Sequence, residues 1–275
     1  MPSPRCSRCW RGYISYDGAG CLPVVDASDR GKGKPLGDTL DVHVKAYQGN
    51  LYDFDNFIQL KWYPKRVMQL ANCNGSLLEL GLGHGITTSM FERHFKRHTV
   101  LDASGAVIEN FRKNYPDSKA KVIKTYFEDF ESDETYEVIV LGYILEHVEH
   151  PGVILKHFRK FLAPEGVMFV TVPNAEVLNR RLGHIAGMLP DILTLSDHDR
   201  LLGHRRYYTV ATLRQEIASA GYAVETMEGI YLKPFTTAQM ISMNFSDAVI
   251  DALCEVGIAY PELSCGILAK IRPSL

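Results

Sequence analysis

The sequence has no long apolar run and no marked excess of charge of either sign. No apolar stretch reaches the roughly 18 residues that a membrane-spanning helix needs, and residues 1–12 lack the apolar segment of a secretory signal. The net charge is −2, so the chain has no overall attraction for nucleic acid. We therefore expect a soluble, cytoplasmic protein that does not enter a membrane and for which a nucleic-acid partner is disfavoured.

Closely spaced cysteines are also scarce. Of the 6 cysteines, only Cys6 and Cys9 have the spacing of metal ligands, and the nearest further candidates, Cys21 and His43, are irregularly placed. We accordingly predict no metal site. Residues 1–40 are rich in Gly, Pro, Ser, Asp and Arg and have little periodicity, which is typical of a loosely ordered N-terminal tail.

Apolar runs of strand length alternate with helical patterns through the middle of the chain. Apolar residues within 41–72 recur at helical spacings, which suggests two helices before the first strand and an N-terminal helical lid. Strands are predicted at 76–80, 99–102, 121–124, 136–141 and 166–172. Helical stretches at 86–97, 105–114 and 152–162, with an acidic link at 128–135, separate the strands. This alternation predicts an α/β fold with a mainly parallel sheet covered on both faces.

The C-terminal part follows a different pattern. It predicts a helix over 209–220, a strand over 224–229, a helix over 238–256 and a last strand over 266–271, which can pair antiparallel between its neighbours. Residues 174–208 form a connection much longer than usual, and such connections are generally functional. We take 73–275 as the main domain and 174–208 as an insertion on the side where a substrate enters.

A glycine-rich turn follows the first predicted strand. Residues 79–85 read Glu-Leu-Gly-Leu-Gly-His-Gly. The spacing of Gly81 and Gly83 differs from the dinucleotide fingerprint, and no Gly-Lys-Ser/Thr of a phosphate loop is present. Glu79 would repel a pyrophosphate but can pair with a cation. The turn therefore favours a positively charged nucleoside without phosphates.

Acidic and aromatic side chains follow the second and third predicted strands. Asp102 should face the glycine turn, because sequential parallel strands usually lie side by side, and its carboxylate suits two ribose hydroxyls. The alternative role is helix N-capping, which Ser104 can perform instead. Phe127 and a carboxylate of Glu128 or Asp129 suit an adenine ring and its amino group, although Phe127 can equally belong to the core.

Small and titratable residues follow the fourth strand. Gly142 would let a ligand approach the backbone, and His147 lies where it can accept a proton near neutral pH. His147 can equally hydrogen-bond the loop backbone.

The long connection carries a cluster of charged and aromatic residues. Arginines in it can bind a carboxylate or phosphate, and histidines in it can deprotonate a hydroxyl or amine. The alternative is a set of solvated charges with one ion-paired cluster around the aspartates of the same segment. The candidate catalytic residues are His147, His198 and His204, and the candidate substrate-binding residues are Arg181, Arg205, Arg206 and Tyr207.

These motifs, in this order, resemble those of class I S-adenosylmethionine-dependent methyltransferases. The matching segments are 79–85, Asp102-Ala-Ser104, Phe127-Glu-Asp129, Leu145-Glu-His147 and Leu162-Ala-Pro-Glu-Gly166, within residues 75–230. The sequence resembles the branch that includes small-molecule enzymes such as the ubiquinone-pathway O-methyltransferases. The resemblance implies a Rossmann-like seven-stranded sheet in the order 3-2-1-4-5-7-6, with the last strand antiparallel.

The same resemblance implies where S-adenosylmethionine binds. It assigns the methionine part of the cofactor to Glu79, Gly81 and Gly83. It assigns the ribose to Asp102, the adenine to Ala103 and Phe127, and the sulfonium edge to Gly142 and Tyr143. In several relatives an N-terminal aromatic closes over the cofactor, which makes Tyr47 or Tyr52 a candidate. His84 and Tyr126 depart from the usual pattern, and Tyr126 replaces a frequent Asp on the adenine side.

The sequence thus predicts methyl transfer from S-adenosylmethionine to O or N of a small metabolite, for instance in secondary metabolism, with arginines available for an anionic acceptor. An RNA or protein methyltransferase is the alternative within enzymes, although no Asn-Pro-Pro-Tyr signature follows the fourth strand. The alternative that is not an enzyme is a non-catalytic scaffold that binds the cofactor. The broad apolar surface of 238–256 can pack on the sheet, cover the pocket or form a homodimer.

Overall fold

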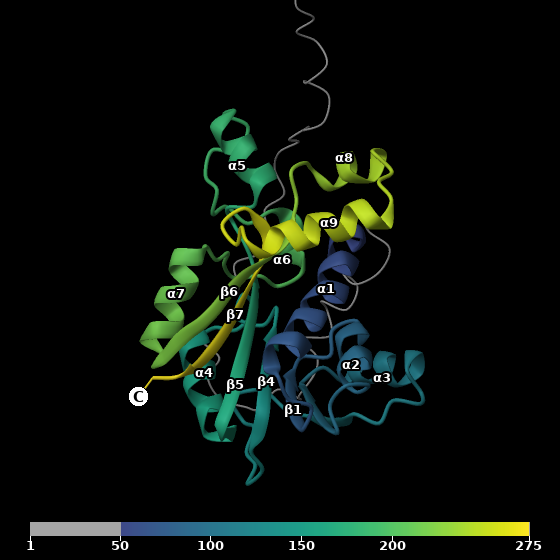
Figure 1. The fold of residues 1–275 in the computed structure, drawn as a ribbon, viewed down its shortest axis with the longest axis vertical. Coiled ribbons are helices and arrows are strands. Elements are labelled where there is room, and N and C mark those ends of the chain that lie inside the picture. The colour runs from purple at the N-terminus through teal and green to yellow at the C-terminus, as the bar shows by residue number, and fades with distance from the viewer. Residues whose placement is uncertain (1–50, 275) are drawn as a thin grey trace, which may run out of the picture. The chain divides into compact units, whose positions relative to one another are not determined.

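The computed structural model of the protein describes residues 51–274 (Figure 1). They belong to the larger of two units into which the chain divides, the one from Leu36 to Leu275. The predictions for the tail 1–40, for Cys6 and Cys9, and for Tyr47 lie outside the described residues.

A single seven-stranded sheet forms the centre of the described part, and its strand order is the predicted β3-β2-β1-β4-β5-β7-β6. β7 pairs antiparallel with both β5 and β6, whereas the other pairs are parallel. The strands are β1 (Ser76–Leu80), β2 (Arg97–Asp102), β3 (Lys121–Lys124), β4 (Tyr136–Gly142), β5 (Leu162–Pro173), β6 (Tyr222–Leu232) and β7 (Ser264–Pro273).

Helices cover both faces of this sheet, as the alternating pattern predicted (Figure 1). The α-helices of the described residues are α1 (Asp53–Ala71), α2 (Ile86–Phe91), α3 (Gly105–Asn114), α4 (Pro151–Phe158), α5 (Leu178–Ile185), α6 (Asp197–Leu201), α7 (Val210–Ser219), α8 (Thr237–Ser242) and α9 (Asp247–Ile258). None of them combines the length and apolarity that crossing a bilayer requires.

Successive residues of the central strands belong to different apolar clusters, because side chains alternate across a sheet. Leu77 of β1 and Val138 of β4 pack in a cluster with residues of α1, α2 and α9. Their neighbours Leu78 and Ile139 pack in the other large cluster with residues of α4 and α7. All five residues of β1 are buried, and its apolar residues Leu77, Leu78 and Leu80 pack on both faces of the sheet.

Strands β1, β2 and β4 end at the same edge of the sheet. Leu80 lies opposite Leu101 of β2 and opposite Leu141 of β4. The segments that follow these strands, namely the glycine turn, Asp102-Ala-Ser104 and Gly142-Tyr143, therefore begin side by side.

The prediction of one helix over 238–256 is wrong. The structure has two helices there, α8 and α9, separated by residues 243–246. Asn244 adopts φ of 45°, which interrupts the helical backbone, and Ser246 precedes the first residue of α9. Because the apolar residues of the two helices share one average spacing, periodicity did not reveal the break.

Other helix bounds differ in smaller ways. The described part of the lid segment contains one helix, α1, which continues through Pro64. α2 ends at Phe91 rather than at Arg97, a turn follows at 92–94, and Arg97 belongs to β2. In the long connection 174–208, the structure has two short helices, α5 and α6.

Candidate functional site

The glycine turn has the left-handed backbone that its glycines allow. Gly81, Gly83 and Gly85 have φ of 84°, 46° and 74°, values that other residues rarely adopt. Gly81 donates its N–H to the carbonyl of Leu101 at 2.8 Å, which ties the turn to β2. A Cβ on Gly83 would meet no atom within 4 Å. The turn therefore presents bare backbone to open space at Gly83.

Asp102 connects the end of β2 to this turn. Its Oδ2 accepts the N–H of Leu82 at 2.9 Å, and its Oδ1 accepts the N–H of Ser104 at 2.8 Å. Ser104, not Asp102, caps α3, because its hydroxyl accepts the N–H of Val107 at 3.1 Å. Asp102 thus faces the glycine turn as expected and is not needed as a helix cap.

Glu79 lies beneath the turn rather than in its open space. It is 1% exposed, and its oxygens accept hydrogen bonds from the hydroxyls of Thr87 at 2.6 Å and Thr88 at 2.7 Å. His98 Nε2 lies 3.0 Å from one of them. Since α2 carries both threonines, Glu79 anchors the start of that helix and places one negative charge under the turn.

Gly142 and Tyr143 contact α1. A Cβ on Gly142 would lie 2.2 Å from the Tyr63 hydroxyl, so this side chain of α1 takes the space beside Gly142. Tyr143 has φ of 57° and donates its hydroxyl hydrogen to Gln59 Oε1 at 2.9 Å. The sequence did not point to Tyr63 or Gln59, because neither belongs to a motif.

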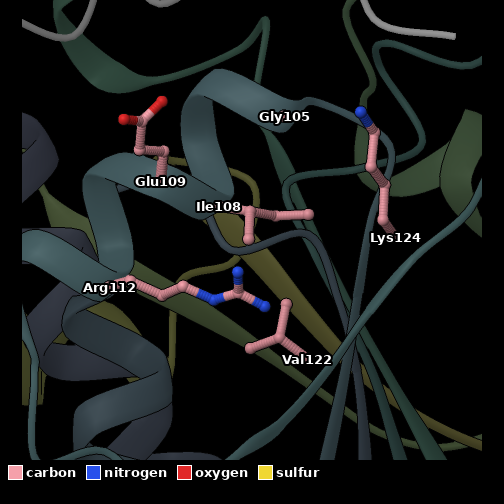
Figure 2. A pocket seen from close by; sticks show the side chains of 6 residues that line it. All are labelled: Gly105, Ile108, Glu109, Arg112, Val122 and Lys124. Carbon is pink, nitrogen blue, oxygen red and sulfur yellow. The ribbon is translucent and has the colours of Figure 1, made fainter.

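The residues predicted for the adenine side follow β2 and β3. Ala103 is buried, Phe127 is partly buried against the core below α4 and α7, and Glu128 is exposed. A hollow nearby, between α3 and β3, contains none of these residues (Figure 2). Its lining consists of Gly105, Ile108, Glu109, Arg112, Val122 and Lys124.

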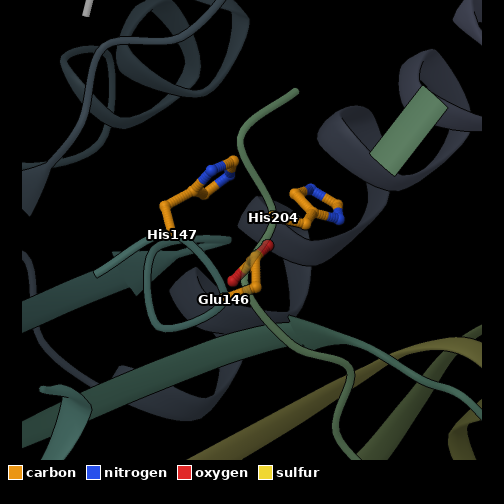
Figure 3. Close-up of side chains that lie close together, drawn as sticks. All are labelled: Glu146, His147 and His204. Carbon is orange, nitrogen blue, oxygen red and sulfur yellow. The ribbon is translucent and has the colours of Figure 1, made fainter. Parts of the chain in front are cut away.

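Residues from the loop after β4 and from the long connection meet on the predicted acceptor side. Glu146, His147 and His204 lie together, and the ring centroids of the two histidines are 4.8 Å apart (Figure 3). Glu146 is 0% exposed, and burial raises the pKa of its carboxyl to about 7. His204 Nδ1 lies 3.3 Å from Asp199 Oδ1.

Asp199 is the centre of a second set of contacts in this region. It accepts hydrogen bonds from the Tyr207 hydroxyl and from Ser196. Burial would raise the pKa of Asp199, but contacts with His204, Ser196 and Tyr207 hold it well below its usual range. Asp199 therefore belongs to a local cluster with His204, Ser196 and Tyr207.

His198 stacks on an aromatic side chain next to α1. Its ring centroid is 4.2 Å from that of Tyr52, and the planes differ by 20°. Its Nε2 is buried and has no hydrogen-bond partner among residues 51–274. Burial lowers the pKa of His198, which favours the neutral imidazole that a proton acceptor requires.

The three candidate arginines have different surroundings. Arg206 donates to the carbonyls of Leu145, Val148 and Glu149 at distances of 3.2, 2.9 and 3.1 Å. Arg181 pairs with Glu176 at 2.9 Å within its own segment. Arg205 has an exposed side chain. Arg206 thus holds the loop that carries Glu146 and His147. Arg205 is more accessible to an anionic ligand than Arg206 is.

We expect the substitution Arg206→Ala to lower the free energy of unfolding by about 2 kcal/mol, because it removes hydrogen bonds from a charged donor to three carbonyls. The matched substitution Arg205→Ala should change it by less than about 0.5 kcal/mol, since that side chain is exposed. Urea unfolding of both variants measures the difference. Equal effects of the two substitutions would contradict the assigned role of Arg206.

The sequence provided partial signals for the residues that it missed. Glu146 stands inside the Leu145-Glu-His147 motif but received no role. Asp199, next to His198, was considered only as a member of an ion-paired cluster. Their importance depends on His204 approaching both of them, from 58 residues after Glu146 (204 − 146). Spacing along the chain does not reveal such an approach.

Residues 56–227 match the family described as a methyltransferase domain, which is more than half of the chain. The sequence is 29% identical over 127 residues to a hybrid PKS-NRPS synthetase from Penicillium oxalicum, covering 42% of this chain and 3% of that protein. It is 25% identical over 135 residues to a ubiquinone biosynthesis O-methyltransferase from Rickettsia bellii, covering 48% of this chain and 56% of that protein. The chain thus spans a small part of the first relative and about half of the second.

The fold is similar to that of the N-methyltransferase NodS from Bradyrhizobium japonicum, solved in complex with S-adenosyl-L-homocysteine. The TM-score is 0.54 and the sequence identity 14%, over 87% of this chain and 99% of that chain. At this identity the likeness concerns the fold.

Proposed function

The chain belongs to the methyltransferase-domain family, and from that premise we propose that it transfers the methyl group of S-adenosylmethionine to an oxygen or nitrogen atom of a small acceptor. One observation carries the proposal: the Asp102 carboxylate is hydrogen-bonded to the glycine turn, beside open space at Gly83. A carboxylate next to bare backbone suits a nucleoside whose ribose needs acceptors and whose sulfonium needs no phosphate site.

Asp102 binds the ribose hydroxyls in this proposal. A carboxylate has about four acceptor positions, and the N–H groups of Leu82 and Ser104 occupy one on each oxygen. Ribose hydroxyls can donate to the same two oxygens. Because the two N–H groups fix the carboxylate before the ligand arrives, binding costs less side-chain entropy.

The remaining cofactor contacts follow from the same edge of the sheet. The backbone of Gly81 and Gly83 receives the methionine part, and Ala103, Phe127 and Glu128 surround the adenine. Glu79 acts through its charge and through the start of α2, because its oxygens already accept two threonine hydroxyls. Gly142 and Tyr143 border the sulfonium, with Tyr63 of α1 beside them.

The acceptor enters from the side of Glu146, His147 and His204. Methyl transfer requires the acceptor atom, the methyl group and the sulfur to lie in line, which is chiefly a matter of positioning. A hydroxyl acceptor must also lose its proton. His147, His198 and His204 are the groups available for this step, and the exposed Arg205 is available for an acidic substituent.

Release of S-adenosylhomocysteine tests the proposal directly. We expect the purified chain with S-adenosylmethionine to release it in the presence of a subset of a panel of small phenols, hydroxy acids and amines, and not with bulk tRNA or protein. Arg205→Ala should raise KM for acidic acceptors selectively if the arginine binds them. Binding of S-adenosylmethionine without release for any acceptor would favour the scaffold alternative, and release with RNA or protein alone would favour a macromolecular substrate.

Residence in the cytoplasm, the absence of a nucleic-acid partner and a homodimer built on α8 and α9 remain predictions of the sequence. Exposed apolar side chains on these helices, Ile241, Val249 and Val256 among them, are consistent with the last.

A further inference from the structure

The acceptor side of the site contains a group of side chains with metal-binding atoms. One ligand atom each of Glu146, His147 and His204 lies within 4.8 Å of the other two. Three atoms bound to one tetrahedral ion at 2.0–2.2 Å lie about 3.3–3.6 Å from one another. The three ligand atoms must therefore draw together by about 1.5 Å at most, which side-chain rotations can provide.

Glu146 is the unusual member of this group. It is 0% exposed, and neither carboxylate oxygen has a hydrogen-bond partner among residues 51–274. A buried carboxylate in this condition is costly unless a cation or a proton compensates it. Arg206 does not supply a direct partner, because its guanidinium is bonded to the three backbone carbonyls of the loop.

Asp199 is close enough to His204 to supply the outer contact that metal-binding histidines usually have. Such histidines commonly face a carboxylate with one ring nitrogen and bind the ion with the other. His204 Nδ1 lies 3.3 Å from Asp199 Oδ1, which leaves Nε2 for an ion. Asp199 is itself held by Ser196 and Tyr207, so the orientation of the His204 ring is supported from outside the cluster.

The backbone around the cluster is also tied in place. Arg205 donates its N–H to the carbonyl of Glu146 at 2.8 Å, which joins the two segments that carry the ligands. Together with the Arg206 contacts, this bond keeps the loop after β4 next to the long connection. The ligand atoms are thus preorganised rather than brought together by chance on a mobile surface.

We propose that Glu146, His147 and His204 bind a divalent first-row transition-metal ion. Two imidazoles with one carboxylate favour ions such as Zn²⁺, Co²⁺, Mn²⁺ or Fe²⁺ over Mg²⁺ and Ca²⁺, which prefer all-oxygen sites. With three protein ligands the ion keeps open positions for water or a substrate oxygen. The expectation from the sequence that the chain has no metal site is replaced by this proposal.

The role of the ion in catalysis, unlike its binding, rests on the proposed methyl transfer. A hydroxyl acceptor would bind the ion through oxygen, and its pKa would fall. The O–H bond breaks and the proton passes to water. The oxygen then forms the new bond to the methyl carbon as the carbon–sulfur bond breaks and S-adenosylhomocysteine leaves. His147 and His204 are ligands in this scheme rather than bases.

Titration with Co²⁺ tests the proposal without reference to activity. The full chain, prepared without a histidine tag and stripped with a chelator, is titrated and followed by visible absorption and calorimetry. Nitrogen and oxygen ligands produce visible bands, whereas thiolates add strong near-ultraviolet absorption, so the free Cys73, Cys254 and Cys265 are distinguishable. A Cys6→Ser, Cys9→Ser variant removes the spaced pair in the N-terminal region.

We expect one Co²⁺ per chain with visible bands and no thiolate absorption. Glu146→Gln, His147→Ala and His204→Ala should each weaken binding on the order of 100-fold, and Asp199→Asn about 10-fold, in line with the loss of inner and outer metal contacts. The exposed His150 lies in the same loop, and His150→Ala is the matched control that should bind as the wild type does.

Either of two results would overturn the proposal: a spectrum due to thiolates alone, or equal Co²⁺ affinity in the wild type and the three ligand variants. Thermal melting of each variant identifies any that fails to fold, and Glu146→Gln preserves the shape of the side chain. S-adenosylmethionine affinity is measured on the same samples. A folded protein that does not bind S-adenosylmethionine would contradict the proposed function, but it would leave the result on metal binding valid.

Discussion

Replacing Asp102 by Ala should lower the affinity for S-adenosylmethionine by about 100-fold. Hydrogen bonds to a charged group contribute about 1.5–3 kcal/mol each, and 1.4 kcal/mol corresponds to a factor of ten. The loss of two ribose hydroxyl contacts alone therefore accounts for the expected factor. The variant also frees the N–H of Leu82 from its partner and so loosens the glycine turn. Isothermal titration calorimetry with S-adenosylmethionine measures the change.

Two glycine variants are expected to differ in how strongly they affect folding, while both should prevent the binding of S-adenosylmethionine. Gly81→Val places a branched side chain at φ of 84° with its Cβ 2.8 Å from Ile144 Cδ1, so both the turn and the binding should suffer. Gly83→Val meets no protein atom within 4 Å of the new Cβ. Its φ of 46° still strains the backbone of the turn, so Gly83→Val should destabilise the fold, though without the added clash of Gly81→Val. In the protein that does fold, binding should be prevented, because the side chain occupies the ligand's space.

The control for Asp102→Ala is Asp117→Ala, which removes an exposed carboxylate after α3. It should bind S-adenosylmethionine as the wild type does. If Asp102→Ala and Gly83→Val both retained wild-type affinity in folded protein, the cofactor site would lie elsewhere.

Local patterns were sufficient to predict the sheet. The runs at 76–80 and 121–124 coincide with β1 and β3, because these short strands are bounded by breaks in the apolar pattern. The late strand at 266–271 lies inside β7, whose antiparallel position between β5 and β6 was expected from the family resemblance. The sequence also indicated where the backbone is left-handed, since the three glycines of the turn all adopt positive φ.

Contacts between distant segments were not predictable in the same way. The Tyr63 hydroxyl lies beside Gly142, and Glu146 lies beside His204, yet nothing in the spacing of either pair indicates contact. Such approaches depend on how α1 and the long connection pack over the end of the sheet. The sequence therefore predicted the side of the sheet for the candidate site, and the structure was required to assign partners to its charged residues.

The attachment of α1 leads to a second prediction with a large effect. Asp55 of α1 is 4% exposed and pairs with Lys233, which is 7% exposed and lies after β6. The hydroxyl of Thr237, at the start of α8, donates a hydrogen bond to the same carboxylate. It accepts one from Lys233 Nζ at 2.8 Å. This buried triad joins the N-terminal helix to the C-terminal segment, and α1 also carries Gln59 and Tyr63, which contact Tyr143 and Gly142.

We expect Lys233→Met to lower the free energy of unfolding by about 3–5 kcal/mol, because it leaves the Asp55 carboxylate buried without its cation. Lys113→Met, at an exposed position of α3, should change it by less than about 0.5 kcal/mol. Urea unfolding of both variants measures the two values. A loss of less than about 1 kcal/mol in Lys233→Met would indicate that water reaches Asp55 and that the pair contributes little.

The double variant Lys233→Met, Asp55→Leu distinguishes a buried charge from lost packing. Asp55 Oδ1 has no hydrogen-bond partner among residues 51–274, so the native pair is incompletely satisfied. Replacing both charges by apolar groups should then recover most of the loss, since buried ion pairs are often no more stabilising than apolar contacts. If the double variant is as stable as the wild type and still binds S-adenosylmethionine, the triad specifies how α1 docks without adding net stability. If it is stable but binds weakly, the position of α1 over Gly142 and Tyr143 depends on the charges themselves.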